Sequence, residues 1–250
     1  MQFPADWIIP DWPAAPRVRA LITTRNGGVS VGSHASLNLG LECGDAPFAV
    51  HANRQRLRAL LPQEPRWMKQ VHGTRVVDAD QLSEVVEADA SYARAPGTVC
   101  AVMVADCMPV LLASRAGDVI GVAHAGWRGL AAGVLEATVA AMNCAPHELI
   151  AYLGPAISAR AFEVGGEVRA AFLAADGAAE TAFSAAGAKK WMADLDLLAR
   201  QRLQRSGVSA VYGERLCTYC DPERFYSYRR AGVTGRMAAL IWIAPSSGET

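Results

Sequence analysis

The chain has 250 residues, of which 52% are hydrophobic and 19% are charged, a balance typical of a globular protein and not of a disordered one. Its 24 basic and 24 acidic residues cancel, so no excess of charge favours nucleic acid or an anionic membrane as a partner. The length, with no repeat and no low-complexity linker, predicts one domain over residues 1–250.

The N-terminal stretch MQFPADWIIPDWPAAP has no basic region followed by a long apolar run, so no signal peptide is predicted. The longest apolar run, MAALIWIAP from Met237, is far shorter than the roughly 20 residues of a membrane helix. We therefore expect a cytoplasmic protein whose six cysteines are thiols, available for metal binding or catalysis.

The predicted elements interleave strands and helices along the chain. In order, we expect a strand at 17–24, a helix that opens at Asp45 and Pro47 and runs to Leu61, short strands at 67–71 and 75–77, strands at 98–104, 109–113 and 119–123, a helix at 130–142, a helix after Gly166, a helix at 194–205 that stops before Gly207, and strands at 208–212 and 237–243. The three central strands are almost wholly apolar, as in a sheet covered on both faces. This pattern predicts a layered α/β or α+β fold with a mixed sheet.

A predicted β-hairpin brings a cysteine close to a histidine. The segment Ser114–Asp118 has the small, glycine-containing signature of a β-turn. A turn centred between Arg115 and Ala116 places Cys107 opposite His124, and a centre shifted by one residue makes the two diagonal neighbours. These separations fit one zinc ion bound by a thiolate at about 2.3 Å and an imidazole nitrogen at about 2.0 Å. Pro109, which follows the cysteine, predicts an irregularity or a sheet edge there.

An open zinc site needs a third protein ligand. Among the remaining histidines, His51 lies on a predicted helix, His147 at a helix start or on the surface, and His34 in a Gly/Ser loop. His72 ends a short strand in KQVHG, and the glycine after it lets the backbone turn. The residues therefore favour His72 as the third ligand.

Several motifs occur in register along nearly the whole chain: TRNGGVS and LNLG within 24–40, KQVHG at 69–73, ADCMPVLL at 105–112, HAGWRG at 124–129, GPAIS at 154–158, FEVG at 162–165, and CTYC, FYSYRR and TGR within 217–236. In these motifs the chain resembles the YfiH-like family, also called the laccase-domain or polyphenol-oxidase-like family. The resemblance implies zinc bound by His72, Cys107 and His124. It also implies an α+β fold with a layered α/β/β/α arrangement of mixed sheets, similar to the catalytic domain of cytotoxic necrotizing factor toxins.

The resemblance further implies phosphorolysis of adenosine, inosine, guanosine and methylthioadenosine, with deamination of adenosine. Phosphorolysis requires a cationic pocket, and the planar guanidinium of arginine binds phosphate through two hydrogen bonds. Arg128, just ahead of a predicted helix, is the favoured contact; other arginines in loops are Arg25, Arg229, Arg230 and Arg236. Trp127 either stacks on the purine or lies buried beneath the site.

Deamination requires a carboxylate that carries protons, for which Asp106 is the candidate. The alternative for Asp106 is that its carboxylate accepts N–H bonds at the strand break. The sequence leaves both open.

Three other functions remain open. A blue copper centre takes two histidines and a cysteine, which leaves three of the five histidines for any further copper cluster, so a laccase is not predicted, although copper can replace zinc. Cys107 beside His124 also fits a cysteine hydrolase or amidase, and metal content distinguishes that enzyme from a zinc enzyme. The resemblance adds the editing of cell-wall peptide precursors, by a cysteine or zinc amidase, as a role linked to some bacterial relatives. A metal-dependent scaffold without turnover is the third.

The pair Cys217 and Cys220 fits a redox site or a second metal site. The sequence favours a third interpretation, in which both are thiols that only pack against their neighbours.

Overall fold

The computed structural model describes residues 3–245 of the chain. The α-helices are α1 (Pro47–Arg58), α2 (Trp127–Ala132), α3 (Val134–Ala141), α4 (Gly166–Ala175), α5 (Leu195–Arg205) and α6 (Tyr228–Ala231). An antiparallel sheet has the order β1 (Val18–Ile22), β12 (Met237–Ile243) and β4 (Val99–Val104). A mixed sheet has the order β11 (Ala210–Tyr212), β7 (Leu149–Leu153), β5 (Met108–Ser114), β6 (Ile120–Ala125), β3 (Ala90–Ala93) and β2 (Val76–Asp78). A small antiparallel sheet has the order β8 (Glu163–Gly165), β10 (Lys190–Ala193) and β9 (Phe183–Ala185).

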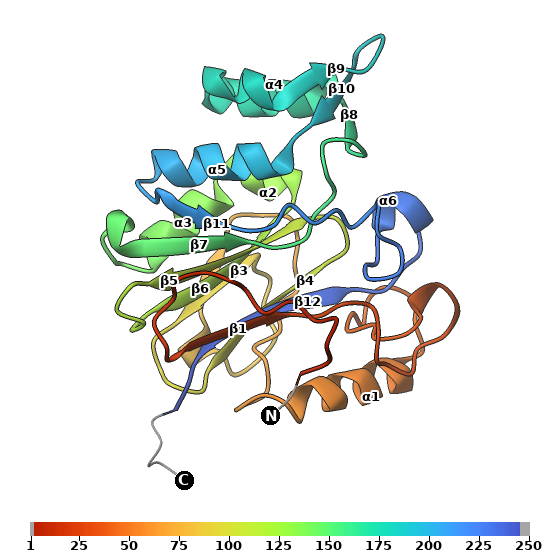
Figure 1. Ribbon diagram of the computed structural model, residues 1–250, viewed down its shortest axis with the longest axis vertical. Helices are drawn as coiled ribbons and strands as arrows, with labels where there is room; N and C mark the ends of the chain where they lie inside the picture. Colours follow the sequence, from red (N-terminus) through yellow and green to blue (C-terminus); the bar gives the residue numbers. More distant parts are fainter. Residues whose placement is uncertain (1–2, 246–250) are drawn as a thin grey trace.

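The two larger sheets lie face to face between helices (Figure 1). One hydrophobic cluster fills the space between the sheets, and a second joins the mixed sheet to α2, α3, α4 and α5. A third cluster joins the antiparallel sheet to α1. The order of layers is therefore helices, mixed sheet, antiparallel sheet and helix, and the predicted α+β fold with a mixed sheet is confirmed.

Strand β12 shows why the apolar strands need cover on both faces. Successive side chains of a strand point to opposite faces. Met237, Ala239 and Ile241 accordingly pack between the sheets, while Leu240 and Trp242 pack toward α1. An uninterrupted apolar run such as that of β12 is thus satisfied only where both faces are buried.

Two helix predictions need correction. The helix expected over 130–142 is two helices, α2 and α3, because Gly133 between them has a φ of 100°, which ends the first and starts the second. The residue before α1 is Ala46, and it makes no side-chain cap. The carboxylate of Asp45 instead accepts hydrogen bonds from the Ser30 hydroxyl, the Asn38 amide and the Ala46 N–H.

The strand predictions also differ from the structure in places. The segment 67–71 forms no strand and pairs only through an isolated bridge at Lys69. Pro109 lies in β5, a central strand, and so does not mark a sheet edge. The irregularity instead precedes β5 at Asp106, whose φ is 96°. Strands β3, β7, β8, β9 and β10 were not predicted.

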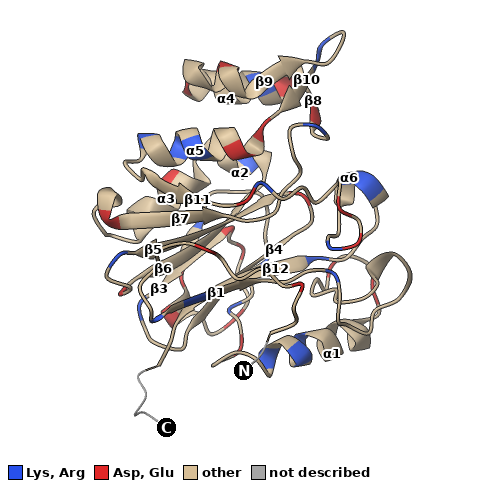
Figure 2. Cartoon of the chain, in the orientation of Figure 1, with Lys and Arg blue, Asp and Glu red and all other residues tan. Residues whose placement is uncertain are grey.

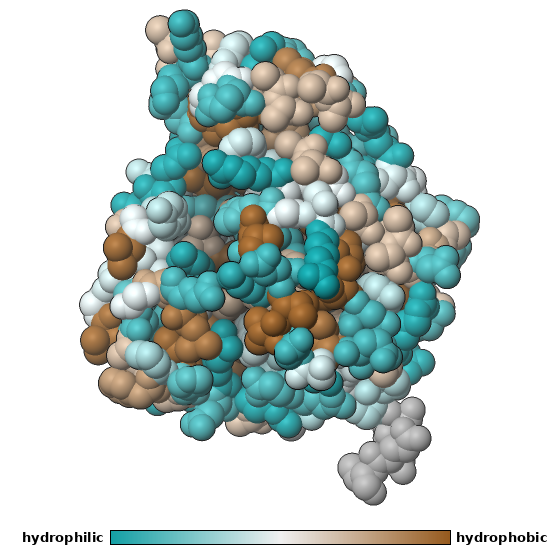
Figure 3. Space-filling model, turned by 180° about the vertical axis from the view of Figure 1, so that it is seen from behind, coloured by the Kyte–Doolittle hydropathy of each residue, from teal (hydrophilic) through white to brown (hydrophobic). Residues whose placement is uncertain are grey.

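Basic and acidic residues are both distributed over the helices, strands and loops of the fold (Figure 2). Seen from behind, hydrophobic residues gather in small patches separated by hydrophilic ones (Figure 3). Within residues 3–245, no helix combines the length and the hydropathy that crossing a bilayer requires.

Candidate metal centre

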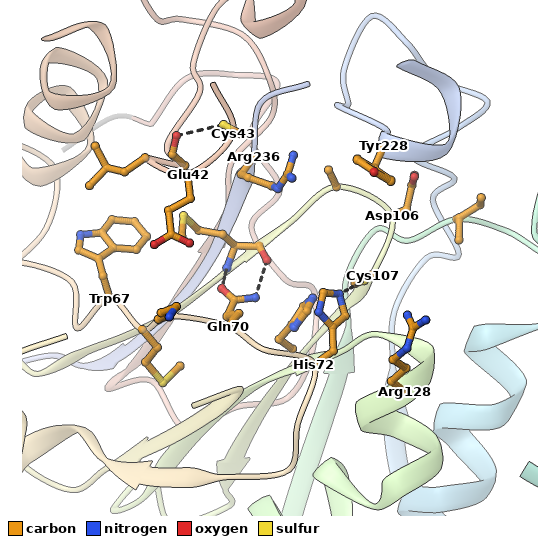
Figure 4. Close-up of a pocket in the computed structure, with 18 of the residues that line it drawn as sticks. Glu42, Cys43, Trp67, Gln70, His72, Asp106, Cys107, Arg128, Tyr228 and Arg236 are labelled. Atoms are coloured by element: carbon orange, nitrogen blue, oxygen red, sulfur yellow. Dashed lines mark hydrogen bonds between the residues drawn. The ribbon is translucent and has the colours of Figure 1, made fainter. Parts of the chain in front are cut away.

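The structure brings His72, Cys107 and His124 together from three separate segments. His72 lies in the loop before β2, Cys107 directly before β5, and His124 within β6. Their donor atoms all lie within 4.8 Å of one another, and Cys107 Sγ is 3.7 Å from His72 Nε2 (Figure 4). The imidazole rings of the two histidines meet edge to face, with their centroids 4.8 Å apart.

The register of β5 and β6 explains how the hairpin places two of these donors. Pro109 pairs with His124, and Met108 pairs with Ala125. This is the shifted register of the two considered, so Cys107 and His124 are diagonal neighbours on one face of the sheet and not directly opposed. Diagonal neighbours lie far enough apart for an ion to fit between the thiolate and the imidazole.

A buried carboxylate that the sequence analysis missed, Asp89, positions both histidines. It is fully buried directly before β3, and its Oδ1 lies 2.8 Å from Nδ1 of His124. Its two oxygens also accept the backbone N–H groups of Val71, His72 and Gly73 at 3.1, 2.9 and 2.7 Å. With His124 Nδ1 directed at this carboxylate, Nε2 is the nitrogen that faces the site, and it becomes a metal ligand once its proton is lost.

The loop that carries His72 is held by further polar contacts. His72 has a φ of 60°, a conformation that the three N–H bonds to Asp89 hold in place. Gln70, two residues earlier, exchanges two hydrogen bonds with the backbone of Met103 in β4, at 2.8 and 2.7 Å. The motif KQVHG is therefore a rigid segment tied to both larger sheets. An acidic residue between two alanines, in EADASYA, was the available signal for Asp89.

The glycines of HAGWRG leave room for the donors. A Cβ on Gly126 would lie 2.8 Å from Cδ2 of His72 and 2.9 Å from Sγ of Cys107. A Cβ on Gly129 would lie 2.8 Å from the carbonyl oxygen of Gly73. Any side chain at either position would displace the ligand cluster or the loop that carries His72.

The thiol and the imidazoles shift each other's pKa. Burial by itself raises the pKa of Cys107, but His124 and His72 outweigh burial and lower it to about 6. Burial lowers the pKa of His124, but Cys107 and Asp89 raise it to about 9. Burial raises the pKa of Asp89, yet the hydrogen bonds from His124 and Gly73 bring it below its ordinary value. One sulfur and two imidazole nitrogens form a donor set that fits zinc, and also copper.

Asp106 lines the cavity, but its carboxylate is engaged by the C-terminal segment. Oδ1 accepts the hydroxyl of Thr218 at 2.6 Å. Oδ2 accepts the hydroxyl of Ser227 at 3.0 Å and the N–H of Arg229 at 2.7 Å. This geometry favours the second of the two roles considered for Asp106, that of an acceptor at the strand break. We therefore do not retain it as the proton carrier.

The donors open into a cavity of about 630 Å³ (Figure 4). Its lining includes the arginines Arg54, Arg128, Arg229 and Arg236 and the aromatic residues Trp67, Trp127, Phe162 and Tyr228. Arg128 is exposed, lies 4.4 Å from the centroid of the Trp127 ring and makes no hydrogen bond or ion pair with any residue of 3–245. Trp127 packs on the core below and also lines the cavity, so it forms part of the cavity wall.

Two of the predicted phosphate contacts lie elsewhere. The guanidinium of Arg25 donates to the carbonyls of Ala35 and Pro222. Arg230 donates to the carbonyls of Thr218, Tyr219 and Phe225. Neither side chain lines the cavity. Both arginines order backbone turns, and we do not retain them as phosphate contacts.

The fold and the donor set define an α+β protein with one cysteine and two histidines grouped for a single transition-metal ion, beside a cavity of ligand size. The chain belongs to the family described as multi-copper polyphenol oxidoreductase laccase, whose model matches residues 19–244. The predicted resemblance to YfiH-like proteins is thereby confirmed.

Relatives with this sequence pattern are known from several bacteria. The chain is 54% identical over 238 residues to purine nucleoside phosphorylase PA4543 of Pseudomonas aeruginosa, covering 95% of this chain and 98% of that one. It is 53% identical over 239 residues to purine nucleoside phosphorylase YfiH of Escherichia coli, covering 94% and 98%. The crystal structure of Neisseria meningitidis protein NMB0706 matches with a TM-score of 0.93 and 51% identity, over 96% of this chain and 100% of that one.

Replacing Gly126 by alanine should weaken metal binding. The new Cβ would lie within 2.9 Å of atoms of both His72 and Cys107, so one donor must move. We expect at least about a 10-fold lower zinc affinity, measured by competition with a chelator, with an unchanged circular dichroism spectrum. The matched control is Gly166→Ala, where a Cβ meets nothing within 4 Å. Equal zinc affinity in the two variants would contradict this account of Gly126.

In the metal-free protein, Cys107 should remain a thiolate at neutral pH. Its pKa is lowered from 9.0 to about 6, so the thiolate is lost only as the pH falls through about 6. The ultraviolet absorbance of the thiolate, taken as the difference between wild type and Cys107→Ser, should follow this titration. Zinc affinity should fall over the same range, since protons then compete for the sulfur. A midpoint near 9 would show that the histidines do not stabilise the thiolate.

Proposed function

We propose that the protein is a zinc-dependent purine nucleoside phosphorylase. It would convert adenosine, inosine, guanosine or methylthioadenosine with phosphate into the free base and the sugar 1-phosphate, and deaminate adenosine as a second activity. The observation that carries the proposal is that the His72, Cys107 and His124 donors and the unpaired Arg128 guanidinium face one cavity. Relatives that are 54% and 53% identical bear the name purine nucleoside phosphorylase, which supports the same class.

The cavity matches the size of the proposed substrates. Its volume of about 630 Å³ lies within the range of roughly 300–1,000 Å³ typical of small-molecule sites. Its aromatic residues provide apolar surface for a purine, and its arginines provide hydrogen-bond donors for an anion. A nucleoside and a phosphate can therefore bind side by side.

Arg128 is the residue proposed to bind and orient phosphate. Its guanidinium lies over the Trp127 ring but makes no hydrogen bond or ion pair within residues 3–245, and Arg128 follows the end of β6 that holds His124. Two parallel N–H bonds would hold the hydrogen phosphate dianion so that one of its oxygens forms a bond to the sugar C1′ while the C1′–N9 bond to the purine breaks. The departing purine takes up the proton that the phosphate loses. Held by His72, Cys107 and His124, zinc would supply Lewis acidity beside these reacting groups.

Deamination needs a proton carrier in addition. Asp89 and Asp106, the carboxylates that adjoin the metal donors, are each engaged by several hydrogen bonds. Glu42 is a further carboxylate, which is exposed and lines the cavity. Because the carboxylates nearest the metal donors are engaged, we propose that phosphorolysis is faster than deamination in this protein.

The test is to measure metal content and adenosine turnover in the same samples. We expect about one zinc per chain in the wild type and adenine release that requires phosphate. Cys107→Ser should lose the zinc and at least about 100-fold of the activity, because the soft thiolate donor is gone. The matched control is Cys144→Ser, whose sulfur is half-buried outside the cavity. Adenosine conversion to inosine without phosphate dependence would overturn the assignment to phosphorolysis.

Replacing Arg128 by alanine should mainly weaken the binding of phosphate. A lost hydrogen bond to a charged group costs about 1.5–3 kcal/mol, which corresponds to roughly a 10- to 150-fold rise in the KM for phosphate. Zinc content should stay unchanged, since Arg128 is not a donor. The control is Arg115→Ala, an exposed arginine in the turn between β5 and β6. An unchanged phosphate KM in Arg128→Ala would exclude this residue as the contact.

A second candidate is a cysteine or zinc amidase that edits cell-wall peptide precursors. The lowered pKa of Cys107 beside two histidines favours it, because a thiolate next to an imidazolium is a nucleophile. The layered fold, which we also expect to resemble the toxin catalytic domain, fits that class. Amide hydrolysis by metal-free protein, with no turnover of purine nucleosides, would select the cysteine enzyme.

Copper-dependent polyphenol oxidation has less support. Within residues 3–245, His72, Cys107 and His124 are the only group of three such donors. Nε2 of His34 is hydrogen-bonded to the carbonyl of Cys43, and His51 and His147 are exposed on the surface, so none of the three joins a second donor group within residues 3–245. A copper ion in place of zinc at the cluster remains compatible with the donor set.

A further inference from the structure

The segment Cys217–Cys220 forms a turn that plays no part in the proposed reaction. Cys217 forms an isolated bridge with Ala156, and its carbonyl accepts the N–H of Asp221 at 3.2 Å. That bond closes one helical turn with the two cysteines at its first and fourth positions. Cys217 is half-buried and Cys220 is exposed, and neither sulfur lines the cavity.

The sulfur of Cys217 lies in a polar environment. It accepts the backbone N–H of Ser158 at 3.4 Å and that of Cys220 at 3.4 Å. Two N–H groups directed at one sulfur stabilise the thiolate, as at the N-terminus of a helix. Burial raises the pKa of Cys217, but the hydrogen bonds with Ser158 outweigh it and the pKa is lowered. The hydrogen bond with Cys217 raises the pKa of Cys220.

Other residues hold the turn in place. Arg230 donates to the carbonyls of Thr218 and Tyr219 at 2.7 and 2.8 Å. The hydroxyl of Thr218 donates to Asp106. Hydrogen bonds with Arg230 and Asp106 thus engage Thr218 and Tyr219, the two residues between the cysteines.

A second metal site is not supported at this turn. Structural zinc takes four ligands from cysteine and histidine. In the part of the chain that the structure describes, no group of three histidine, cysteine or carboxylate donors includes Cys217 or Cys220. Two thiols without a third donor are better suited to reaction with each other.

The spacing of the cysteines permits a disulfide. Side chains three residues apart on a helical turn have Cβ atoms roughly 5–6 Å apart. A disulfide needs about 3.5–4.5 Å between Cβ atoms, so a small contraction of the turn closes it. A strained, exposed disulfide of this kind is reduced easily, which makes its formation reversible.

We propose that Cys217 and Cys220 are a redox-active dithiol that exchanges with small-molecule disulfides, with Cys217 as the attacking sulfur. The Cys217 thiolate forms a bond to one sulfur of the small disulfide, whose S–S bond breaks and releases one thiolate that takes up a proton. Cys220 then loses its proton, attacks the sulfur of Cys217 and releases the second small thiol. The protein dithiol is oxidised by two electrons, and the small disulfide is reduced to two thiols.

The test exposes the zinc-loaded protein and its variants to glutathione disulfide and maps the products by peptide mass spectrometry. The wild type should gain one Cys217–Cys220 disulfide, which dithiothreitol reverses. Cys220→Ser should accumulate a glutathione adduct on Cys217, because the second step is blocked. In Cys217→Ser, the remaining Cys220 should react at least about 10-fold more slowly than Cys217 does in Cys220→Ser.

Serine at position 217 can accept the same two N–H bonds, so the variant retains the contacts of the turn. Cys144→Ser is the control and should react as the wild type does. A parallel tube contains dithiothreitol and glutathione disulfide without the protein. If Cys217 and Cys220 of the wild type remain free thiols after that dithiothreitol is completely oxidised, the proposal is overturned. A Cys217→Ser variant that reacts as fast as Cys220→Ser would overturn the assignment of Cys217.

Discussion

The site depends on the buried carboxylate of Asp89. A charge without exposure to water is costly unless hydrogen bonds compensate it, and here three backbone N–H groups and one imidazole do so. Those same donors belong to the loop of His72 and to His124. The contacts that make the buried charge tolerable are therefore the contacts that place two metal donors. Losing the carboxylate would leave the loop of His72 without its main partner.

The motif HAGWRG joins this arrangement to the cavity in only six residues. His124 is a donor at the end of β6, and Gly126 leaves the space in which His72 and Cys107 approach each other. Gly129 lets α2 pack against the carbonyl of Gly73. Between the glycines, Trp127 supplies part of the cavity wall. Arg128 supplies a guanidinium that makes no hydrogen bond or ion pair within residues 3–245. Such close packing of loop, strand and helix explains why neither glycine admits a side chain.

Much of this site was visible in the sequence because hairpin geometry is local. The apolar strands around Ser114–Asp118 and the turn between them place Cys107 near His124 whichever of the two registers forms. Asp89 could not be found in this way, since its partners lie 16 to 18 residues before it or 35 after it. Arg25 and Arg230, predicted as phosphate contacts, lie outside the lining of the cavity, and the sequence could not show this for a related reason. An arginine that binds distant carbonyls has the same sequence context as one that faces a ligand.

The carboxylate of Asp106 connects the irregular backbone before β5 to the C-terminal segment. Its three partners, Thr218, Ser227 and Arg229, follow it by more than 110 residues and include the N-cap of α6. Thr218 lies in the turn formed by Cys217–Cys220, and Arg229 lies on the wall of the cavity. Asp106, directly before Cys107, therefore holds both the turn and this part of the wall. One carboxylate thus contacts both the turn that carries the two cysteines and the wall of the cavity, so the proposed disulfide and the cavity share a hydrogen-bonded neighbour.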